Sequence, residues 1–539
     1  MNEEEYFLHV SQISRLLQAV FSCIGIFDMP KILFEDNDFL AVQKPAGIPS
    51  HKVADLAPEG FYEFLCRRLH LEHLGLHQRL DKETSGVMLF AKSPLANKSL
   101  AEQFASSRIK KTYFFLSPQK APQNAWTCRD AITGKPATTE FEFIEKHGAY
   151  FLYEARPQTG RTHQIRIHAK SSDCPILGDS QYGIKMPGDS PASGRMYLHA
   201  GKLEFFHPLT GQTTSIEAAL PEAFDKPSVS RVARDFVECL FDGTETNAYR
   251  LAPYSKGQPS KYFIDIYKQF ALVSTESEDA GQSGVLDELV EQGIISCYHK
   301  QLDKKVRGQA NGPTHLAGDL MNDDFYIREN GLRFLISFKE GYSAGLFLDQ
   351  RENRFDLKYW CQQNPGVEVL NVFSYSCAFS VAAAAAGART TSLDLSTKYL
   401  DWGKKNFSAN KIPVEGHDFI FGDAFDWMRR FSKKGRKFDC VILDPPTFST
   451  NKDGKVFRAD KNYGELVALA IKLLKRPGLL FCSTNMGTLK PFDFERIIKM
   501  EIQKAGRKIR KQHFQAEPFD FLLPGSPSFY LKTFWFWLE

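Results

Sequence analysis

The sequence predicts a multidomain protein in which an α+β domain comes first and an α/β domain with a parallel sheet follows. Its 539 residues are enough for about three to four domains. Between residues 30 and 221, short apolar runs are separated by turns, which predicts strands. After residue 367, strand-like apolar runs alternate with helix-like ones, which is typical of a parallel sheet with crossover helices.

The composition excludes disordered chains and proteins that span a membrane. Hydrophobic residues make up 43% of the chain and charged residues 24%, as in ordinary globular proteins. The mean hydropathy is −0.33, and no run approaches the roughly 18 apolar residues of a spanning helix. The acidic start at residues 1–5 is unlike an export signal, and the ten cysteines form no C-x-x-C pair. We therefore expect a cytoplasmic protein with reduced thiols.

The net charge gives little support for nucleic-acid binding, because 68 basic and 64 acidic residues leave only +4. Any affinity must come from local basic clusters. Three such clusters occur, at residues 108–111, 433–437 and 507–511. Taken alone, each is better explained as a solvated face.

The individual strands follow from the apolar runs. In the first half they are expected at residues 32–34, 39–42 and 87–91, and a Pro-, Gly- and Ser-rich stretch at 184–195 is expected to be a loop. A polar region at 242–254 is expected to join two domains. In the second half, strands are expected at 367–373, 391–395, 419–421, 438–443, 479–483 and 529–538.

The most informative segment of the first half is 77–86, where Asp81 stands just before a Thr-Ser-Gly turn at the entrance of a strand. Such a turn would hold a carboxylate rigidly near a cleft, although a simple charged loop explains the segment alone equally well. The segment is accompanied by motifs at 33–36, 42–47, 111–113, 159–168, 175–179 and 197–200. In this order they resemble the RluA-type pseudouridine synthases over roughly residues 30–222.

That resemblance implies a mixed-sheet pseudouridine-synthase domain that isomerises uridine without a cofactor. Asp81 would be the essential carboxylate, with Arg166 as the neighbouring cation and Arg161 as the alternative. Tyr113 would stack on the base and relay its C5 proton, and an ordinary core aromatic is the competing interpretation. Arg79 would help flip the uridine out of its helix. The sequence departs from the family at Gln78, where histidine is usual, which bears on RNA contacts.

In the second half, acidic residues stand at the ends of successive predicted strands. Asp394 follows the loop at 374–380 by about 20 residues, which suits a carboxylate that binds ribose hydroxyls. Asp423 and Asp444 follow at the ends of two further strands. Open α/β sheets bind their ligands at this edge. A dinucleotide-binding domain is an alternative for the fold, but the chain has no G-x-G-x-x-G motif.

The second half, about residues 247–539, resembles class I S-adenosylmethionine methyltransferases of the ribosomal RNA group, with the motif at 345–351 before the core. This implies a small α/β subdomain, a Rossmann-like seven-stranded methyltransferase domain and S-adenosylmethionine as cofactor. Asp394 would hold the ribose, Asp423 the adenine amine and Asp444 the substrate end of the cofactor. The loop residues Phe373, Ser374 and Tyr375 would also contact it. Cys377 stands where the family usually has glycine, which bears on cofactor affinity.

The sequence also indicates which base atom receives the methyl group. Relatives that methylate C5 of cytosine use a cysteine thiolate after the fifth strand, and Asn485 occupies that place here. Cys482 lies inside the strand and is better explained as a core thiol. Asp444-Pro445-Pro446 with Asn485 resembles the domain that makes 7-methylguanosine, so we expect methylation of guanine N7, with Phe448 stacking on the purine.

The favoured hypothesis is a bifunctional RNA-modifying enzyme that acts on 23S ribosomal RNA or a pre-ribosomal particle, with no metal, membrane or obligate protein partner. An RNA-binding ribosome-assembly factor with one or both sites inactive is a second hypothesis, and the intact Asp81 and Asp444 argue against it. A methyltransferase whose first half only docks RNA is a third. The expected limits are an extension at 1–30, a synthase domain at 31–225, a linker at 226–246, a subdomain at 247–338 and a methyltransferase domain at 339–539.

Overall fold

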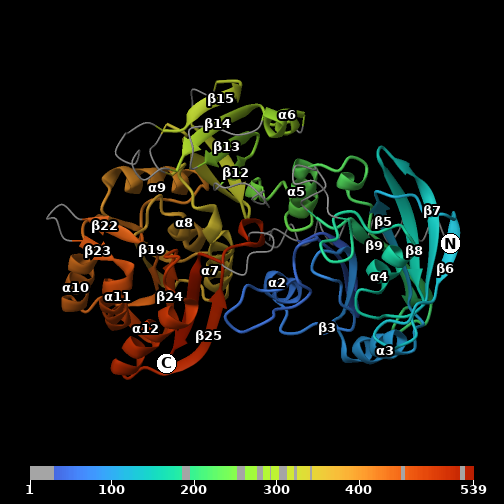
Figure 1. Ribbon diagram of the computed structural model, residues 1–539. Coiled ribbons are helices and arrows are strands. Elements are labelled where there is room, and N and C mark those ends of the chain that lie inside the picture. The colour runs from blue at the N-terminus through green and yellow to red at the C-terminus, as the bar shows by residue number, and fades with distance from the viewer. Residues whose placement is uncertain are drawn as a thin grey trace.

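The computed structural model describes residues 30–184, 195–251, 262–275, 283–291, 293–302, 312–320, 324–339, 343–450, 456–522 and 529–539. The predicted extension at 1–30 and the predicted loop at 184–195 fall almost entirely outside these ranges. Figure 1 shows three sheet units, an N-terminal unit on the right, a C-terminal unit on the left and a small sheet at the top. No helix in the described ranges is long and apolar enough to cross a membrane.

The N-terminal unit is a ten-stranded sheet in the order β1-β2-β4-β9-β5-β8-β7-β6, with β3 and β10 paired to β4 and β9. The β4–β9 pairing is parallel and its other pairings are antiparallel, so the expected mixed sheet is confirmed. Its strands are β1 (Ile32–Glu35), β2 (Phe39–Lys44), β3 (Gly75–Leu76), β4 (Ser85–Ala91), β5 (Lys110–Ser117), β6 (Ala125–Cys128), β7 (Thr139–His147), β8 (Tyr150–Pro157), β9 (Leu198–Phe206) and β10 (Thr213–Glu217). Its helical segments are α2 (Phe61–Arg68), α3 (Pro94–Ala105), α4 (Gln164–Ser171) and the 3-10 helix η2 (Glu222–Phe224).

The region between the two large sheets differs from the expected linker, because it contains helix α5 (Val229–Glu238). Val237, Leu240 and Phe241 pack into the core of the N-terminal unit. The burial of these apolar side chains orders the segment, although its overall composition is polar. A five-stranded sheet, a helix and a hairpin follow. They are β11 (Ala248–Leu251), β12 (Tyr262–Tyr267), β13 (Phe270–Thr275), α6 (Ser283–Glu291), β14 (Ser296–Gln301), β15 (Thr314–Gly318), β16 (Phe325–Glu329) and β17 (Leu332–Ile336).

The C-terminal unit is the expected seven-stranded sheet, in the order β20-β19-β18-β21-β24-β26-β25. The first five strands of this order are parallel, and β26 is antiparallel to both of its neighbours. The strands are β18 (Glu368–Val372), β19 (Arg389–Asp394), β20 (Asp418–Phe421), β21 (Phe438–Leu443), β24 (Leu474–Thr484), β25 (Ile509–Gln515) and β26 (Lys532–Leu538), with a hairpin of β22 (Phe448–Thr450) and β23 (Val456–Arg458). The helical segments are η4 (Leu348–Gln350), α7 (Arg351–Gln363), α8 (Ala378–Ala385), α9 (Thr397–Ala409), α10 (Ala424–Lys433), α11 (Ala459–Leu473), α12 (Pro491–Lys504) and η5 (Phe519–Phe521).

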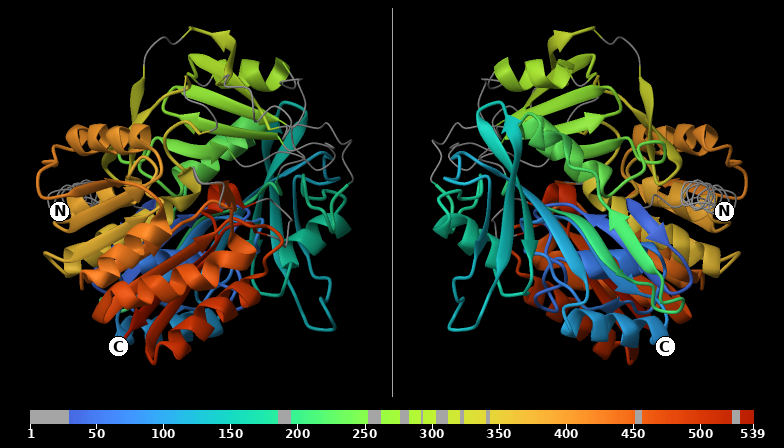
Figure 2. Two further views of the ribbon diagram at one scale, coloured as in Figure 1. Left: turned by 90° about the vertical axis from the view of Figure 1, so that its left-hand side faces the viewer. Right: turned by 90° about the vertical axis from the view of Figure 1, so that its right-hand side faces the viewer.

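Helices cover both faces of this sheet, which explains why its central strands are apolar on both sides. Leu370 and Val372 of β18 face the core formed with α10, α11 and α12. Val369 of the same strand faces the core formed with α7 and α8. The views in Figure 2 show these helices around the strands. The carboxyl ends of the parallel strands are left open as a common edge, where ligands of such sheets bind.

Side chains at the helix starts fix where several of these helices begin. Ser93 accepts a hydrogen bond from the backbone N–H of Ala96 at the start of α3, and Ser396 does the same for Tyr399 at the start of α9. Asp423 accepts from the backbone N–H of Asp426 and begins α10. Each cap satisfies an N–H that has no partner within its helix. Asp423 is therefore held by its own helix at the open edge of the sheet.

Candidate active sites

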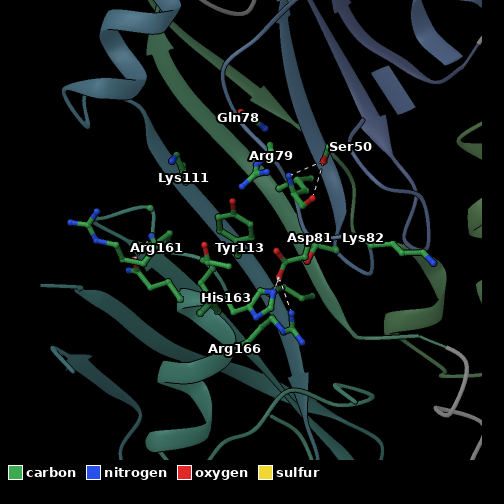
Figure 3. A pocket seen from close by; sticks show the side chains of 18 of the residues that line it. Ser50, Gln78, Arg79, Asp81, Lys82, Lys111, Tyr113, Arg161, His163 and Arg166 are labelled. Atoms are coloured by element: carbon green, nitrogen blue, oxygen red, sulfur yellow. Dashed lines mark hydrogen bonds and ion pairs between the residues drawn. The ribbon is translucent and has the colours of Figure 1, made fainter. Parts of the chain in front are cut away.

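The N-terminal unit contains a cleft of about 570 Å³. Its walls come from the segment after β2, the loop before β4, strand β5 and the loop before α4. The five residues predicted for a site in this half, Asp81, Tyr113, Arg166, Arg79 and Arg161, all line it. Figure 3 shows these side chains around one opening.

Asp81 is paired with Arg166 inside the cleft. The Arg166 Nη1 atom donates to Asp81 Oδ2 at 3.0 Å. The rest of this guanidinium is held by the buried Asp179, because Nε and Nη2 donate to its two carboxylate oxygens at 2.7 and 2.9 Å. Asp179 therefore fixes the orientation in which Arg166 meets Asp81.

Of the two arginines predicted as alternatives, Arg166 and not Arg161 makes this contact with Asp81. Arg161 is exposed and donates from Nε to the carbonyl of Pro136 at 3.2 Å. His163, which the sequence analysis did not single out, is nearer, with Nε2 at 3.8 Å from Asp81 Oδ2. Its Nδ1 lies 3.1 Å from the hydroxyl of Tyr182. The sequence could have indicated this residue, because His163 stands inside the motif at 159–168.

Tyr113 enters the cleft from β5. Burial, and then the charge of Asp81, raise the pKa of Tyr113 above its ordinary value. Its phenol is therefore neutral and suits stacking on a base. A neutral phenol accepts a proton only as it gives up its own, so any relay of the C5 proton needs a further acceptor.

Arg79 and Gln78 lie at the rim of the cleft. Arg79 is exposed. The Gln78 amide donates from Nε2 to the carbonyl of Val87 at 2.9 Å. Gln78, which stands where the family usually has histidine, thus makes a structural hydrogen bond to β4.

Two buried side chains and one glycine fix the loop that carries Asp81. Lys44 is fully buried and donates from Nζ to the carbonyls of Pro45, Ile48 and Lys82. Ser50 Oγ donates to the carbonyl of Leu80 at 2.8 Å and accepts from its N–H. Gly86 has a φ of +121°, and a Cβ there would lie 2.2 Å from the carbonyl oxygen of Ala200. The turn after Asp81 therefore needs glycine for β4 to pair with β9.

The three acids predicted in the second half do lie at one edge of the seven-stranded sheet. Asp394 ends β19, Asp423 follows β20, and Asp444 follows β21. Asp394 accepts from the backbone N–H of Tyr375 at 2.8 Å and of Ser396 at 2.9 Å. The acid is thereby tied to the loop after β18, which was predicted to contact the same ligand.

This loop has an unusual backbone. Phe373, Tyr375 and Cys377 have φ values of +62°, +47° and +60°, a region that glycine adopts without strain and other residues rarely adopt. The side chain of Cys377 is buried against Gly403 of α9, where an added Cβ would lie 2.3 Å from its sulfur. Gly403 thus makes room for the residue that replaces the family's glycine, and the thiol points into the core.

We expect Gly403→Ala to destabilise the protein by about 1–3 kcal/mol, because the new methyl group overlaps Cys377 in a packed core. The displaced loop should also weaken S-adenosylmethionine binding. The double variant Gly403→Ala/Cys377→Gly removes the overlap and should recover both properties. Thermal unfolding and calorimetric titration measure them, and a single variant as stable as the parent would disprove the pairing.

Asp444 is held by Gln350 and Ser483, two side chains that come from elsewhere in the fold. Gln350 Nε2 donates to Asp444 Oδ1 at 3.1 Å and to Ser483 Oγ at 2.8 Å. Burial, together with the nearby charge of Asp349, raises the pKa of Asp444 to about 6. Asp349 was not predicted as a site residue, although it lies in the motif at 345–351. It accepts a hydrogen bond from Tyr530 Oη at 2.9 Å.

The residues predicted to meet the acceptor base lie beside this acid. Thr447 Oγ1 donates to Asn485 Oδ1 at 2.6 Å, which joins the loop after β21 to the loop after β24. Phe448 is 62% exposed and is available for stacking on a base. Cys482 is fully buried, and burial raises the pKa of its thiol well above the ordinary value. It behaves as the core thiol that the sequence predicts.

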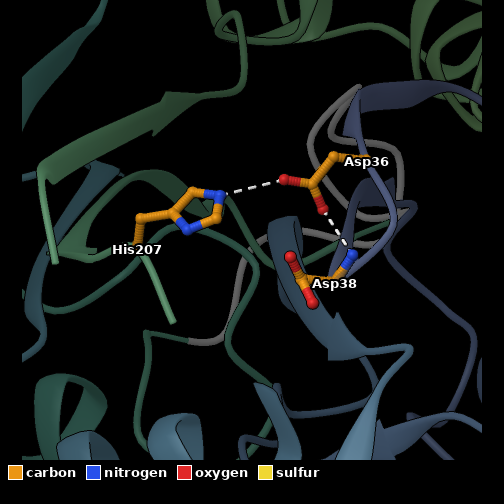
Figure 4. A group of neighbouring side chains, drawn as sticks. All are labelled: Asp36, Asp38 and His207. Atoms are coloured by element: carbon orange, nitrogen blue, oxygen red, sulfur yellow. Dashed lines mark hydrogen bonds and ion pairs between the residues drawn. The ribbon is translucent and has the colours of Figure 1, made fainter. Parts of the chain in front are cut away.

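One further group of neighbouring acids and histidine lies outside both sites (Figure 4). Asp36 accepts from the backbone N–H groups of Asp38 and Phe39, and its other oxygen lies 3.0 Å from His207 Nε2. Asp38 accepts from Ser93 Oγ at 2.9 Å. These side chains are used by the turn before β2 and by the end of β9, so the group is explained as a structural tie.

Comparisons with known proteins divide the chain in the same way. Residues 38–171 match the family model of the RNA pseudouridylate synthases. Residues 294–514 match the family model of the S-adenosylmethionine-dependent methyltransferases.

Individual relatives match parts of the chain. Ribosomal RNA large subunit methyltransferase I of Yersinia pseudotuberculosis is 32% identical over 315 residues, which cover 56% of this chain and 77% of that protein. Ribosomal RNA large subunit methyltransferase K of Neisseria meningitidis is 38% identical over 166 residues, 30% of this chain, and the chain spans about half (46%) of its length. Human RNA pseudouridylate synthase domain containing 4 is 26% identical, with 38% of this chain and 92% of that chain covered and a TM-score of 0.31.

Proposed function

Because the chain belongs to the family of S-adenosylmethionine-dependent methyltransferases that includes the ribosomal RNA large subunit methyltransferases, we propose that it modifies ribosomal RNA at two separate sites. The N-terminal cleft would convert a uridine to pseudouridine, and the open edge of the C-terminal sheet would methylate a guanine at N7. The proposed folded units are 31–225, 247–338 and 339–539, and the proposed substrate, 23S ribosomal RNA or a pre-ribosomal particle, places the enzyme in the cytoplasm. The observation that supports the double function is that each half has a carboxylate at its own candidate site, Asp81 in the N-terminal cleft and Asp444 at the open edge of the C-terminal sheet.

In the proposed isomerisation, Asp81 is the group that drives cleavage of the bond between uracil and ribose. Arg166 holds it in place, and Asp179 holds Arg166 in place. Tyr113 stacks on the uracil while the base turns and rejoins the ribose through carbon. Arg79 helps to hold the nucleotide out of its helix, a step that exposes a bond otherwise buried in the stack. Arg161 is available at the exposed rim for contact with the RNA backbone.

The C-terminal edge fits S-adenosylmethionine by the chemistry of its side chains. The cofactor, when bound, supplies an electrophilic methyl group on a positively charged sulfur. The carboxylates of Asp394, Asp423 and Asp444 suit its ribose hydroxyls, its adenine amine and its cationic amino-acid end, respectively. The backbone of the loop at 373–375 is free to approach it, because the side chain of Cys377 is turned toward Gly403.

The surroundings of Asp444 favour guanine N7 as the acceptor atom. Alkylation at N7 leaves a positive charge on the purine and needs no base, because no proton leaves that nitrogen. Asp444 and Asp349 are two carboxylates near the reacting end, and such charges stabilise a cation that develops there. Phe448 and Asn485 would hold the ring, so catalysis would consist mainly of positioning.

Methylation of cytosine C5 needs a reactive thiolate instead. The cysteines of residues 339–539 are Cys361, Cys377, Cys440 and Cys482, and all four are buried. Cys482→Ser should therefore leave the rate of methyl transfer unchanged within about twofold. No covalent complex should form with RNA that contains 5-fluorocytidine. Trapping such a complex on a denaturing gel would overturn the choice of N7.

Two labels in one reaction test the double function. Purified protein is incubated with ribosomal RNA that carries tritium at uridine C5 and with S-adenosylmethionine that carries a labelled methyl group. The proposal expects tritium release and methyl incorporation. Methyl incorporation alone would support an N-terminal half that only docks RNA, and neither signal would support an inactive assembly factor.

A further inference from the structure

Helix α2 of the N-terminal unit packs against α7 of the C-terminal unit, and Figure 1 shows α2 between the two large sheets. Arg68, the last residue of α2, is fully buried at this contact. Its Nε donates to Glu352 Oε2 at 3.0 Å, and its Nη1 donates to Asn330 Oδ1 at 3.0 Å. Its guanidinium also lies 4.1 Å from the ring centre of Phe355.

A buried guanidinium with these partners is tied to the interface and has no access to RNA. Removing one member of a buried ion pair is costly, because its partner stays buried without compensation. Glu352 is also 2.8 Å from Arg67 Nη2, and Arg67 in turn reaches Asp356 at 3.3 Å. The ring of His70 stacks on Tyr359 with 5° between the planes. Side chains that follow one another on α2 and beyond it therefore hold successive turns of α7.

The start of α7 leads directly to the methyltransferase site. Gln350 immediately precedes α7, and Glu352 is the second residue of that helix. Gln350 is 3% exposed and donates to both Asp444 and Ser483. The side-chain oxygen Oε1 of Gln350 accepts from Asn353 Nδ2 at 2.7 Å. A shift of this first turn would move the amide that holds Asp444.

We propose that Arg68 is a positioning residue for methyl transfer, which acts from the N-terminal unit through Glu352, α7 and Gln350 on Asp444. The inference rests on the proposed function of the C-terminal site. Arg68 lies far outside the residues 294–514 that match the methyltransferase family. The supporting frame of the methyltransferase site is thus completed by the other half of the chain, and the two halves are more than tethered enzymes.

The full-length variant Arg68→Met tests this. The kcat for methyl transfer should fall about tenfold, because a small displacement of a positioned group is enough for such a loss. The Kd for S-adenosylmethionine should rise as well, because Asp444 is proposed to bind the cofactor, whereas the rate of tritium release from uridine should stay within about twofold of the parent value. Arg156→Met is the matched control, since Arg156 of β8 is also paired with acids but its side chain is 42% exposed. An unchanged kcat in Arg68→Met would overturn the proposal.

A double-mutant cycle tests the route. Glu352→Gln removes the charge but keeps an oxygen for Arg68, and Arg68→Met added to it should cause little further loss. A further full tenfold loss would exclude Glu352 as the link. If Arg68→Met does not fold, Arg68→Lys replaces it, because lysine keeps the charge but cannot hold both oxygens of Glu352. Its kcat should still fall, and a parental kcat would count against the proposal.

Hydrogen exchange of the α7 amides separates this inference from the function on which it rests. The exchange should be faster in Arg68→Met than in the parent, and unchanged in Arg156→Met. A parent protein that transfers no methyl group would refute the proposed function, while the exchange would still show whether Arg68 holds α7. Equal α7 exchange in all three proteins would refute the positioning role alone.

Discussion

Asp81→Asn is expected to abolish pseudouridine formation, with a loss of at least about 1,000-fold in tritium release from labelled uridine. The amide keeps the size of the side chain and an oxygen for Arg166 Nη1, which now lies 3.0 Å from the carboxylate. It lacks the negative charge that the proposed chemistry requires, and an amide cannot replace a carboxylate as a nucleophile. The fold should persist, because the loop is held by Lys44 and Ser50 through backbone carbonyls.

The control for this variant is methyl transfer in the same preparation, which should be unchanged because the described side-chain contacts of Asp81 lie within the N-terminal cleft. Asp173→Asn makes the same chemical change at an exposed carboxylate next to the end of α4 and should retain full activity. Near-normal tritium release by Asp81→Asn would show that the catalytic carboxylate lies elsewhere.

Asp394→Ala is expected to weaken S-adenosylmethionine binding by roughly 1.5–3 kcal/mol, or about 10- to 150-fold in Kd. The variant loses the charge-assisted hydrogen bonds that Asp394 is proposed to make with the ribose. It also leaves the N–H groups of Tyr375 and Ser396 without the acceptor that now orders the cofactor loop. Calorimetric titration of the full-length protein measures the change.

Asp394→Asn separates these two effects, because its amide oxygen can still accept one of the backbone N–H groups. Its loss of affinity should be smaller than that of Asp394→Ala. Asp401→Ala, an exposed acid on α9 that pairs only with Lys404 in the described contacts, should bind as the parent does. Equal affinity in the parent and in Asp394→Ala would remove Asp394 from the cofactor site.

Much of this arrangement could be predicted because it depends on local sequence. Strand ends follow from apolar runs, and the sheet then brings Asp394, Asp423 and Asp444 to one edge. The placement of Asp81 beside a cleft follows from a short motif in the same way. These features need only the period of the hydrophobic pattern and the rule that parallel strands share an open edge.

Other features depend on contacts between distant residues, which no local pattern encodes. The choice of Arg166 over Arg161 depends on the buried Asp179 that turns its guanidinium. The loop can accommodate the side chain of Cys377 only because Gly403, one helix further along the chain, leaves space for it. The basic cluster at 507–511 was expected to be a solvated face, yet Arg507 donates to the carbonyls of Lys475 and Glu539 at the start of β25.

The central claim is that one chain makes two different base modifications, and the products themselves test it most directly. Ribosomal RNA from a strain that lacks this protein is incubated with the purified full-length chain, with and without S-adenosylmethionine. The RNA is then digested to nucleosides and analysed by mass spectrometry. We predict pseudouridine in both reactions and 7-methylguanosine only in the reaction that contains S-adenosylmethionine. New 5-methylcytidine in place of 7-methylguanosine, or no new pseudouridine, would contradict the account.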